Sequence, residues 1–257
     1  MGYFETIILG VVEGITEFLP ISSTGHLILS QVFLGIERSE FLKSFTIIIQ
    51  LGAILSVVIL YWRALFIERI IWKKIIVAFL PTAAIGFVLY RLIKTYLLGS
   101  DSIVVLMLFL GGIALIVFEL LRGKDKKEGG GINSITYKQA FFVGLTQSLA
   151  VVPGVSRSAA TIIGGLALGI SRKAIVQFSF LLAVPTMAAA TGLDLIKSGF
   201  SFSAHEFLFL GVGFIASFLI AMITIRLLLK FIEKHTFIAF GVYRIIIAVL
   251  FLVFVMN

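Results

Sequence analysis

The sequence predicts an all-α polytopic membrane protein with an inverted-topology repeat, in which each half holds one re-entrant helical hairpin and three transmembrane helices. Of its 257 residues, 60% are hydrophobic and 13% are charged, whereas charged residues make up roughly 25% of a typical soluble domain. A soluble protein of this length cannot bury so much apolar surface, so we expect lipid to surround it. The whole chain, 1–257, is predicted to form a single integral membrane domain.

Six apolar runs have the length of about 20 residues that a membrane-spanning helix requires. These runs are 44–61, 75–92, 102–121, 174–195, 207–229 and 236–256. Two further apolar stretches, 3–34 and 138–170, are interrupted near the middle by proline, glycine and small hydroxyl residues. Because each arm has only about 12 to 16 residues, neither arm crosses the bilayer comfortably. We interpret these stretches as two re-entrant hairpins, hairpin 1 (3–34) and hairpin 2 (138–170).

The two halves of the chain repeat one another. Three residue pairs are 133 positions apart and one glycine pair is 134 apart, namely Pro20 with Pro153, Ser23 with Ser156, Phe45 with Phe178, and Gly10 with Gly144. Repeat 1 is predicted to cover 1–121 and repeat 2 to cover 137–257, with a cytoplasmic linker at 122–136. Since three spans follow each hairpin and three is odd, the second half must insert upside down relative to the first.

The distribution of basic residues orients this layout. One predicted face carries 14 of the 21 lysines and arginines and the opposite face carries five. The positive-inside rule makes the first face cytoplasmic and places both termini outside the cytoplasm. The net charge is +8, but the basic residues lie between apolar runs and are not clustered on one folded surface. This distribution argues against a nucleic-acid partner. The lack of cysteine excludes disulfides and Cys-ligated metals.

The tip of hairpin 1 combines carboxylates, hydroxyls and an imidazole. Glu13 and Glu17 are four residues apart, which places both carboxylates on one helical face. The turn that follows supplies the side chains of Ser22, Ser23, Thr24 and His26. Ionisable groups at membrane depth are costly, so we interpret this cluster as part of a functional site.

The tip of hairpin 2 supplies a cation and further polar groups, which are Gln147, Ser156, Arg157, Ser158 and Thr161. Because the hairpins enter from opposite faces, we expect their tips to meet near the middle of the membrane. Two helix N-termini and the Arg157 guanidinium would then form an anion site. Glu13 and Glu17 would repel an anion unless they hold a divalent cation or one of them stays protonated. Charge neutralisation, a nucleophile and a proton carrier are the groups that phosphoryl transfer needs.

Two motifs occupy these tips. One is Glu-x-x-x-Glu followed by a serine-rich turn, from Glu13 to His26, and the other is Pro-Gly-x-Ser-Arg-Ser-x-x-Thr, from Pro153 to Thr161. Together they resemble the motifs of the undecaprenyl-diphosphate phosphatases, a family often called bacitracin-resistance proteins. The number and order of spans are also similar, so the resemblance covers essentially the whole chain.

The resemblance implies hydrolysis of undecaprenyl diphosphate to undecaprenyl phosphate and inorganic phosphate at the outer side of a bacterial inner membrane. This reaction recycles the lipid carrier for peptidoglycan synthesis and gives bacitracin resistance. The resemblance makes Ser23 the nucleophile and Arg157 the phosphate clamp, with Glu17 and His26 handling protons or positioning the nucleophile. Glu13 and Glu17 would bind Mg²⁺ or Ca²⁺, and no organic cofactor is expected. The phosphate site would be lined by Ser22, Thr24, Ser156, Ser158, Thr161 and Gln147.

Other functions stay open on the residues alone. Inverted repeats with broken helices are also typical of secondary transporters, so a transporter or flippase is the main rival. A purely structural scaffold would not keep costly charges at both tips. Ser22 is chemically equivalent to Ser23, and direct attack by water is a further alternative to a covalent intermediate. A homodimer is compatible with the sequence.

Four other ionisable residues receive no role. Arg244 lies inside the last predicted span. Its position is compatible with a structural ion pair at least as well as with a catalytic role. Glu119, Asp194 and His205 lie near the ends of predicted spans, where contact with water explains their charge.

Overall fold

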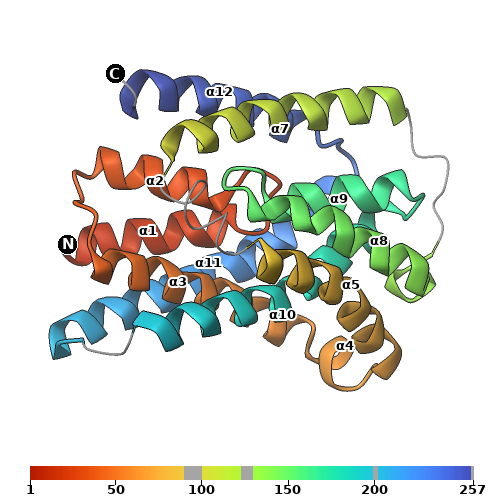
Figure 1. The fold of residues 1–257 in the computed structure, drawn as a ribbon, viewed down its shortest axis with the longest axis horizontal. Helices are drawn as coiled ribbons and strands as arrows, with labels where there is room; N and C mark the ends of the chain where they lie inside the picture. The colour runs from red at the N-terminus through yellow and green to blue at the C-terminus, as the bar shows by residue number, and fades with distance from the viewer. Residues whose placement is uncertain (90–99, 123–129, 199–201, 256–257) are drawn as a thin grey trace.

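The computed structural model describes residues 1–89, 100–122, 130–198 and 202–255, and every regular element in these ranges is a helix (Figure 1). The prediction of an all-α protein is therefore confirmed. Three predictions fall partly outside the described residues: 90–92 of the span at 75–92, 123–129 of the linker, and Met256 of the last span.

Five of the helices are long and apolar enough to cross a membrane, and the chain is a multi-pass membrane protein. They are α3 (Glu40–Leu60), α5 (Arg69–Val88), α7 (Asp101–Arg122), α10 (Arg172–Ser198) and α11 (Ala204–Ile232). The sixth predicted span corresponds to α12 (Ile238–Val255), a shorter apolar helix. A short helix that the sequence did not predict, α4 (Trp62–Phe66), connects α3 to α5.

Helix α5 begins earlier than predicted, at Arg69 rather than at 75. Its first turns carry Arg69, Lys73 and Lys74, which a search for apolar runs excludes from a span. Lys74 is nevertheless only 6% exposed, and its ammonium donates a hydrogen bond to the Asn133 carbonyl at 2.9 Å. This hydrogen bond to a backbone carbonyl compensates the burial of the Lys74 ammonium.

Both predicted hairpins are broken helices whose tips point toward each other (Figure 1). Hairpin 1 consists of α1 (Tyr3–Thr16) and α2 (Ser23–Phe33). Hairpin 2 consists of α8 (Tyr137–Gln147), its 3-10 extension η3 (Ser148–Val151) and α9 (Arg157–Ala167). The two arms pack against each other within each hairpin. At a rise of about 1.5 Å per residue, none of these arms is long enough to span the hydrocarbon core.

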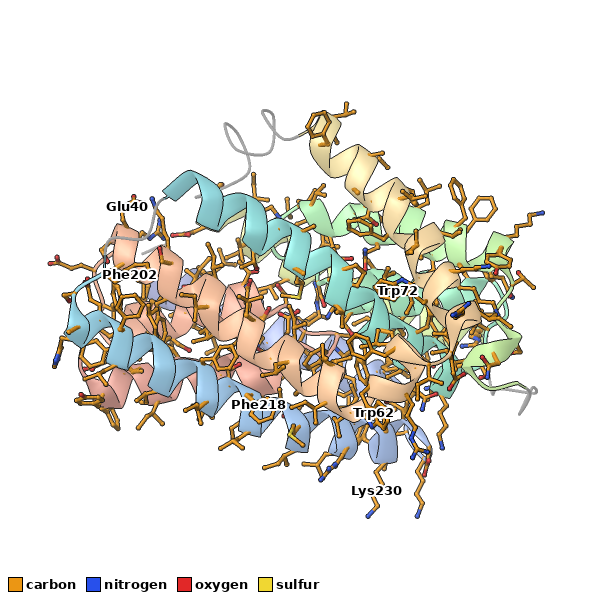
Figure 2. The ribbon with its side chains drawn as sticks, turned by 90° about the horizontal axis from the view of Figure 1, so that it is seen from below. Glu40, Trp62, Trp72, Phe202, Phe218 and Lys230 are labelled. Atoms are coloured by element: carbon orange, nitrogen blue, oxygen red, sulfur yellow. The ribbon has the colours of Figure 1, made fainter. Side chains whose placement is uncertain are left out.

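The long helices run between two distinct ends of the molecule. At the termini end, where both chain ends lie, Arg38 pairs with Asp101 at 2.6 Å and the rings of Phe33 and Phe254 are 5.3 Å apart (Figure 1). At the opposite end, Lys173 pairs with Glu233 at 3.0 Å. We call this the basic end, and it carries Arg122, Arg172, Lys173, Lys230 and Lys234. Figure 2 shows Trp62, Trp72 and Lys230 at this end and Glu40 and Phe202 at the other.

The expectation that water solvates Glu119 is wrong. Glu119 is 5% exposed, and it forms an ion pair of 3.1 Å with Arg172 at the basic end. Its carboxylate also accepts a hydrogen bond from the Phe237 backbone N–H at 3.2 Å. The tertiary structure therefore brings the end of α7 to Arg172, the first residue of α10, and to Phe237, which precedes α12. His205 is exposed as expected, and the Asp194 side chain lies outside the described residues.

Glycines allow each hairpin to approach a neighbouring helix closely. A Cβ on Gly10 would lie 2.7 Å from the Gly213 carbonyl oxygen of α11, closer than side-chain carbons pack. A Cβ on Gly144 would overlap the Ala78 carbonyl oxygen of α5. The pair Gly10 and Gly144, predicted to be equivalent in the two halves, thus has the same packing role in each hairpin.

Candidate active site

The turn at each hairpin tip contains a serine in a backbone conformation that L residues rarely adopt. Ser22 has φ of 71° and ψ of 96°, and Ser156 has φ of 75° and ψ of 113°. Among the described residues, these two are the non-glycine residues with positive φ. Such conformations cost on the order of 1–3 kcal/mol and concentrate at functional sites. Each serine is the N-cap of the helix that follows it, so the unusual backbone conformation sets the direction in which α2 and α9 begin.

This shared geometry pairs the two tips with an offset that differs by one residue from the predicted offset of 133. The structure makes Ser156 equivalent to Ser22, which is 134 residues earlier, and not to Ser23. Gly10 and Gly144 are also 134 residues apart. Pro20 and Pro153 are 133 residues apart, so they differ from this offset by one residue. In this register the first helical residue is Ser23 in hairpin 1 and Arg157 in hairpin 2.

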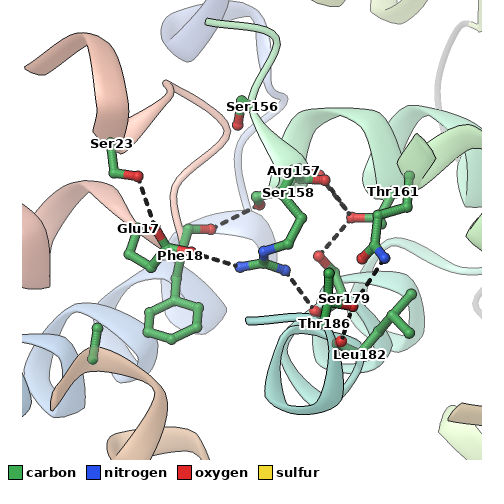
Figure 3. A network of polar contacts seen from close by, with 12 residues as sticks. Glu17, Phe18, Ser23, Ser156, Arg157, Ser158, Thr161, Ser179, Leu182 and Thr186 are labelled. Carbon is green, nitrogen blue, oxygen red and sulfur yellow. Dashed lines mark hydrogen bonds and ion pairs between the residues drawn. The ribbon is translucent and has the colours of Figure 1, made fainter. Parts of the chain in front are cut away.

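The two tips are joined through Glu17, as Figure 3 shows. The Ser23 hydroxyl donates a hydrogen bond to Glu17 Oε2 at 2.7 Å. Arg157 Nη2 contacts Glu17 Oε1 at 3.2 Å, and the two side chains are 10% and 5% exposed. Arg157 Nη1 donates to the Ser179 carbonyl at 2.9 Å, which fixes the guanidinium against α10. A hydroxyl, a carboxylate that accepts from it and a cation that orients the carboxylate form the arrangement of an activated nucleophile.

A cavity of about 140 Å³ lies at this cluster. Its volume is suited to a small polar group rather than to a whole lipid. It is lined by polar and charged side chains from both tips and by neighbouring residues: Glu17, Ser22, Ser23, Thr24, Gln50, Ala150, Val152, Pro153, Gly154, Ser156, Arg157 and Met187.

The starts of α2 and α9 both face this cavity, and both are suited to an anion. The first N–H groups of a helix have no partner within the helix and carry a partial positive charge. The Ser22 side chain caps none of them, while Ser156 Oγ accepts from the Ala159 N–H at 3.2 Å. The buried Arg157 Nε also has no hydrogen-bond partner among the described residues. The starts of both helices and the Arg157 side chain thus line one cavity, which is compatible with the predicted anion site.

Three predicted phosphate-binding residues lie behind the cavity instead of lining it. Ser158 Oγ donates to the Phe18 carbonyl at 2.8 Å, and Thr161 Oγ1 lies 2.6 Å from Ser179 Oγ. Gln147 is 1% exposed, and its amide nitrogen donates at 3.0 Å to the hydroxyls of two threonines, Thr82 and Thr186. Helix packing turns the two hydroxyls and the Gln147 amide nitrogen toward protein partners, so these residues do not line the cavity in this structure.

His26 also lies outside the cavity lining. Its Nδ1 is 2.8 Å from the Ser22 carbonyl oxygen, and its Nε2 is 2.9 Å from the Tyr243 hydroxyl. The imidazole and phenol rings are stacked, with centroids 5.4 Å apart and an angle of 8° between planes. Both ring nitrogens are therefore engaged, and the contact with Ser22 places His26 where it holds the turn that carries Ser23.

Glu13 is fully buried behind Glu17. Neither of its carboxylate oxygens has a hydrogen-bond partner among the described residues, and the adjacent charge is that of Glu17. Two neighbouring carboxylates in apolar surroundings require either a shared proton or a cation. Oxygen donors of this kind fit Mg²⁺ or Ca²⁺. In the described part of the chain no cluster of three or more metal-binding side chains exists, so a cation here would take its other ligands from a phosphate and water.

Arg244 is a structural residue, but it forms hydrogen bonds to carbonyls and no ion pair among the described contacts. It is fully buried and donates to five backbone carbonyl oxygens at 2.8 to 3.3 Å. These carbonyls belong to Pro20 at the tip of hairpin 1, to Gly154 and Val155 at the tip of hairpin 2, and to Met107 and Leu108 of α7. Arg244 thus links both hairpin tips to the spanning helices.

The structure adds three polar residues that the sequence did not indicate. Gln50 of α3 lines the cavity, Ser179 of α10 holds Arg157, and Tyr243 of α12 holds His26. Gln50 interrupts an otherwise apolar run, which is a signal that sequence analysis could have used. Ser179 acts through its backbone carbonyl, and a tyrosine within a span is common, so neither had a recognisable signal.

The fold and this site define a multi-pass helical membrane protein with a polar cavity between two broken-helix tips. A family model described as Bacitracin resistance protein BacA matches residues 6–250, and the chain belongs to that family. It is similar to the undecaprenyl-diphosphatase of Aquifex aeolicus, with 52% identity over 254 residues that cover 99% of both chains. It is 48% identical to the undecaprenyl-diphosphatase of Persephonella marina over 256 residues, 100% of both chains. The undecaprenyl-diphosphatase of Wolinella succinogenes is 50% identical over 252 residues, 98% of both chains.

Proposed function

We propose that this chain is an undecaprenyl-diphosphatase, which hydrolyses undecaprenyl diphosphate to undecaprenyl phosphate and inorganic phosphate. Membership of the family and the names of its full-length relatives support this activity. The observation that carries the mechanism is the hydrogen bond of 2.7 Å from Ser23 to Glu17, whose second oxygen pairs with Arg157. This arrangement contains more than a binding site needs, because it presents a nucleophile together with a proton acceptor.

The cavity binds the terminal phosphate of the substrate, and the lipid chain remains in the membrane. Arg157 and the N–H groups at the starts of α2 and α9 neutralise the phosphate oxygens. Donors already fixed in place stabilise the charge of the transition state without reorganising. Gln50 offers a further amide donor from α3.

Ser23 Oγ attacks the terminal phosphorus, and Glu17 Oε2 accepts its proton as the bond to the bridging oxygen breaks. Undecaprenyl phosphate leaves, and the phosphoryl group stays on Ser23. Glu17 passes this proton to the departing undecaprenyl phosphate and is again a carboxylate. It then accepts a proton from the water that attacks the phosphoserine and returns that proton to Ser23 Oγ, which releases inorganic phosphate and restores the serine. His26 acts as a positioning residue through Ser22, because both of its ring nitrogens are already bonded.

Glu13 and Glu17 would hold a divalent cation. Such an ion, when bound, supplies additional charge neutralisation at the diphosphate. The buried Glu13 oxygens without a partner support this assignment. No organic cofactor is needed for hydrolysis of a phosphoanhydride.

We infer that the chain consists of two inverted repeats, 1–121 and 137–257, in a bacterial inner membrane. The matching backbones of Ser22 and Ser156 and the opposed hairpins support the repeat (Figure 1). The concentration of lysine and arginine at the basic end supports a cytoplasmic position for that end and an extracytoplasmic position for both termini. The activity would return the lipid carrier to peptidoglycan synthesis and confer bacitracin resistance. A homodimer is compatible with this arrangement.

The test is phosphate release from undecaprenyl diphosphate by the purified chain in detergent, where no gradient exists. We expect turnover by the wild type and a loss of at least about 10³-fold in Ser23→Ala, since removal of a nucleophile is among the largest catalytic losses. Ser30→Ala, also on α2 but outside the cavity lining, is the matched control and should retain activity. Substrate binding without turnover by the wild type would instead support a transporter.

An acid quench during turnover distinguishes a covalent intermediate from direct attack by water. We expect phosphate to be recovered on Ser23 in the wild type and no phosphoserine in Ser23→Ala. Turnover that depends on Ser23 but leaves no trapped phosphate at any quench time would favour water as the nucleophile.

A further inference from the structure

A large apolar groove lies between the end of α1 and the basic end of α11 and α12. Its volume is about 810 Å³, far larger than that of the catalytic cavity, and the two share no lining residue. The groove wall consists mainly of aliphatic and aromatic side chains, among them Ile15, Leu19, Leu227, Phe231 and Phe240. Ile15 and Leu227 are 42% and 61% exposed, so the groove opens to the surroundings of the protein.

One end of the groove is positively charged. Lys230 and Lys234 are exposed, lie four residues apart at the end of α11, and have no ion pair among the described residues. The third charged lining residue, Glu233, is compensated by Lys173 at 3.0 Å. The groove therefore presents two lysine ammonium groups without a counter-charge, and Figure 2 shows Lys230 projecting from the body of the protein.

An empty groove of this kind is unfavourable within a bilayer. Its apolar wall would lose dispersion contacts on one side. Away from the charged end, water would find no free donor there, because Thr224 Oγ1 donates to the Ile220 carbonyl at 2.9 Å. Hydrocarbon is available from the surrounding lipid. Basic pockets between transmembrane helices are suited to anionic lipid head groups.

We propose that this groove binds an anionic phospholipid of the membrane leaflet at the basic end. An acyl chain packs against Ile15, Leu19 and Leu227, and the phosphate of the head group contacts Lys230 and Lys234. Leu19 is two residues beyond Glu17, so the bound chain braces the tip of hairpin 1 from the side opposite the catalytic cavity. The lipid is thus a stabilising ligand, separate from the substrate.

The test measures binding of phosphatidylglycerol and of phosphatidylcholine with identical acyl chains to the full chain in a neutral detergent. Native mass spectrometry gives the affinities and thermal unfolding gives the stabilisation. We expect phosphatidylglycerol to bind more tightly and to raise the melting temperature more. Lys230→Gln/Lys234→Gln should weaken the binding of phosphatidylglycerol about 30-fold, since each lysine near a membrane surface contributes about 1 kcal/mol.

The matched control is Lys73→Gln/Lys138→Gln, which removes two exposed lysines elsewhere at the basic end. It should leave phosphatidylglycerol affinity unchanged, and both double variants should retain phosphate release. Leu227→Trp, which fills part of the groove, should weaken both lipids. Equal affinity for the two lipids, or equal losses in the two double variants, would overturn the proposal. Tighter binding of a polyprenyl phosphate, or competition by soluble glycerol phosphate, would also overturn it.

Discussion

The tips of hairpin 1 and hairpin 2 have the same backbone but carry opposite charges. Both turns contain a serine with φ near 70° followed by the first residue of a helix. At that first position hairpin 1 has the nucleophile candidate Ser23 and hairpin 2 has Arg157. At the equivalent position in the preceding helix, hairpin 1 has the buried Glu13 and hairpin 2 the buried, neutral Gln147.

This difference shows how two turns with the same backbone can form an asymmetric site. The common backbone supplies two helix starts that attract an anion, and this part of the site needs no particular side chain. Two tips with Arg157 would bind phosphate without attacking it, and two tips with Glu13 and Glu17 would repel it. In the proposed mechanism, the acidic tip supplies the nucleophile and the basic tip binds the phosphate.

Among the changes that test the different roles of the two tips, replacing the proton acceptor of hairpin 1 should reduce activity most. Glu17→Gln is expected to reduce kcat about 10³-fold, because an amide does not accept the proton of Ser23. Phosphate release at saturating substrate is the measurement. Glu119→Gln is the control, since Glu119 forms a comparably buried ion pair with Arg172 far from the cavity. It should lower thermal stability and leave kcat nearly unchanged; equal kcat losses would mean that Glu17 has only a structural role.

Changing the cation of tip 2 without removing its charge should have the next largest effect. Arg157→Lys is expected to lower kcat/KM about 10²-fold, because a lysine cannot contact Glu17, Ser179 and a phosphate at once. Arg172→Lys at the basic end provides the comparison, and it should keep full kcat/KM. Wild-type kinetics in Arg157→Lys would show that tip 2 contributes only a diffuse positive charge.

Replacing Glu13 by glutamine, the residue at the equivalent position of hairpin 2, tests whether a divalent cation takes part in the reaction. Excess EDTA is expected to slow the wild type about tenfold, and added Mg²⁺ or Ca²⁺ should restore the rate. Glu13→Gln, which copies Gln147, should be slow from the start and respond little to either treatment. Full wild-type activity in excess EDTA would remove the cation from the mechanism and leave a shared proton as the explanation for the two carboxylates.

The smallest effect is expected from the feature that both tips share, which is a serine with positive φ. Ser22→Gly and Ser156→Gly should each raise stability by about 1 kcal/mol, because glycine adopts positive φ without strain. The gain should be slightly smaller for Ser156, whose side chain caps Ala159. Thermal unfolding in detergent measures both. A decrease in stability for either variant would show that its serine side chain outweighs the backbone strain.

Much of the site could be predicted from local sequence. Glu17, Ser23 and Arg157 were assigned to one site, and the structure brings their side chains into contact. The assignment succeeded because prolines and glycines mark helix breaks and because charged residues at membrane depth are rare. The motif of hairpin 2 places Ser158 and Thr161 at the same site, and Gln147 is a polar residue before the turn, but all three form hydrogen bonds with residues outside the cavity lining.

The sequence by itself determined that this chain is helical and membrane-embedded, where its two helices break, and which charges lie at the breaks. Apolar runs, turn residues and charges are local properties, so they can be read without a fold. Only the tertiary structure decided which way each side chain points and which register relates the tips. Arg244 illustrates the reason, since its five carbonyl partners come from hairpin 1, hairpin 2 and α7. Contacts between segments so distant in sequence depend on how helices pack and rotate against one another, and that information is not contained in any single segment.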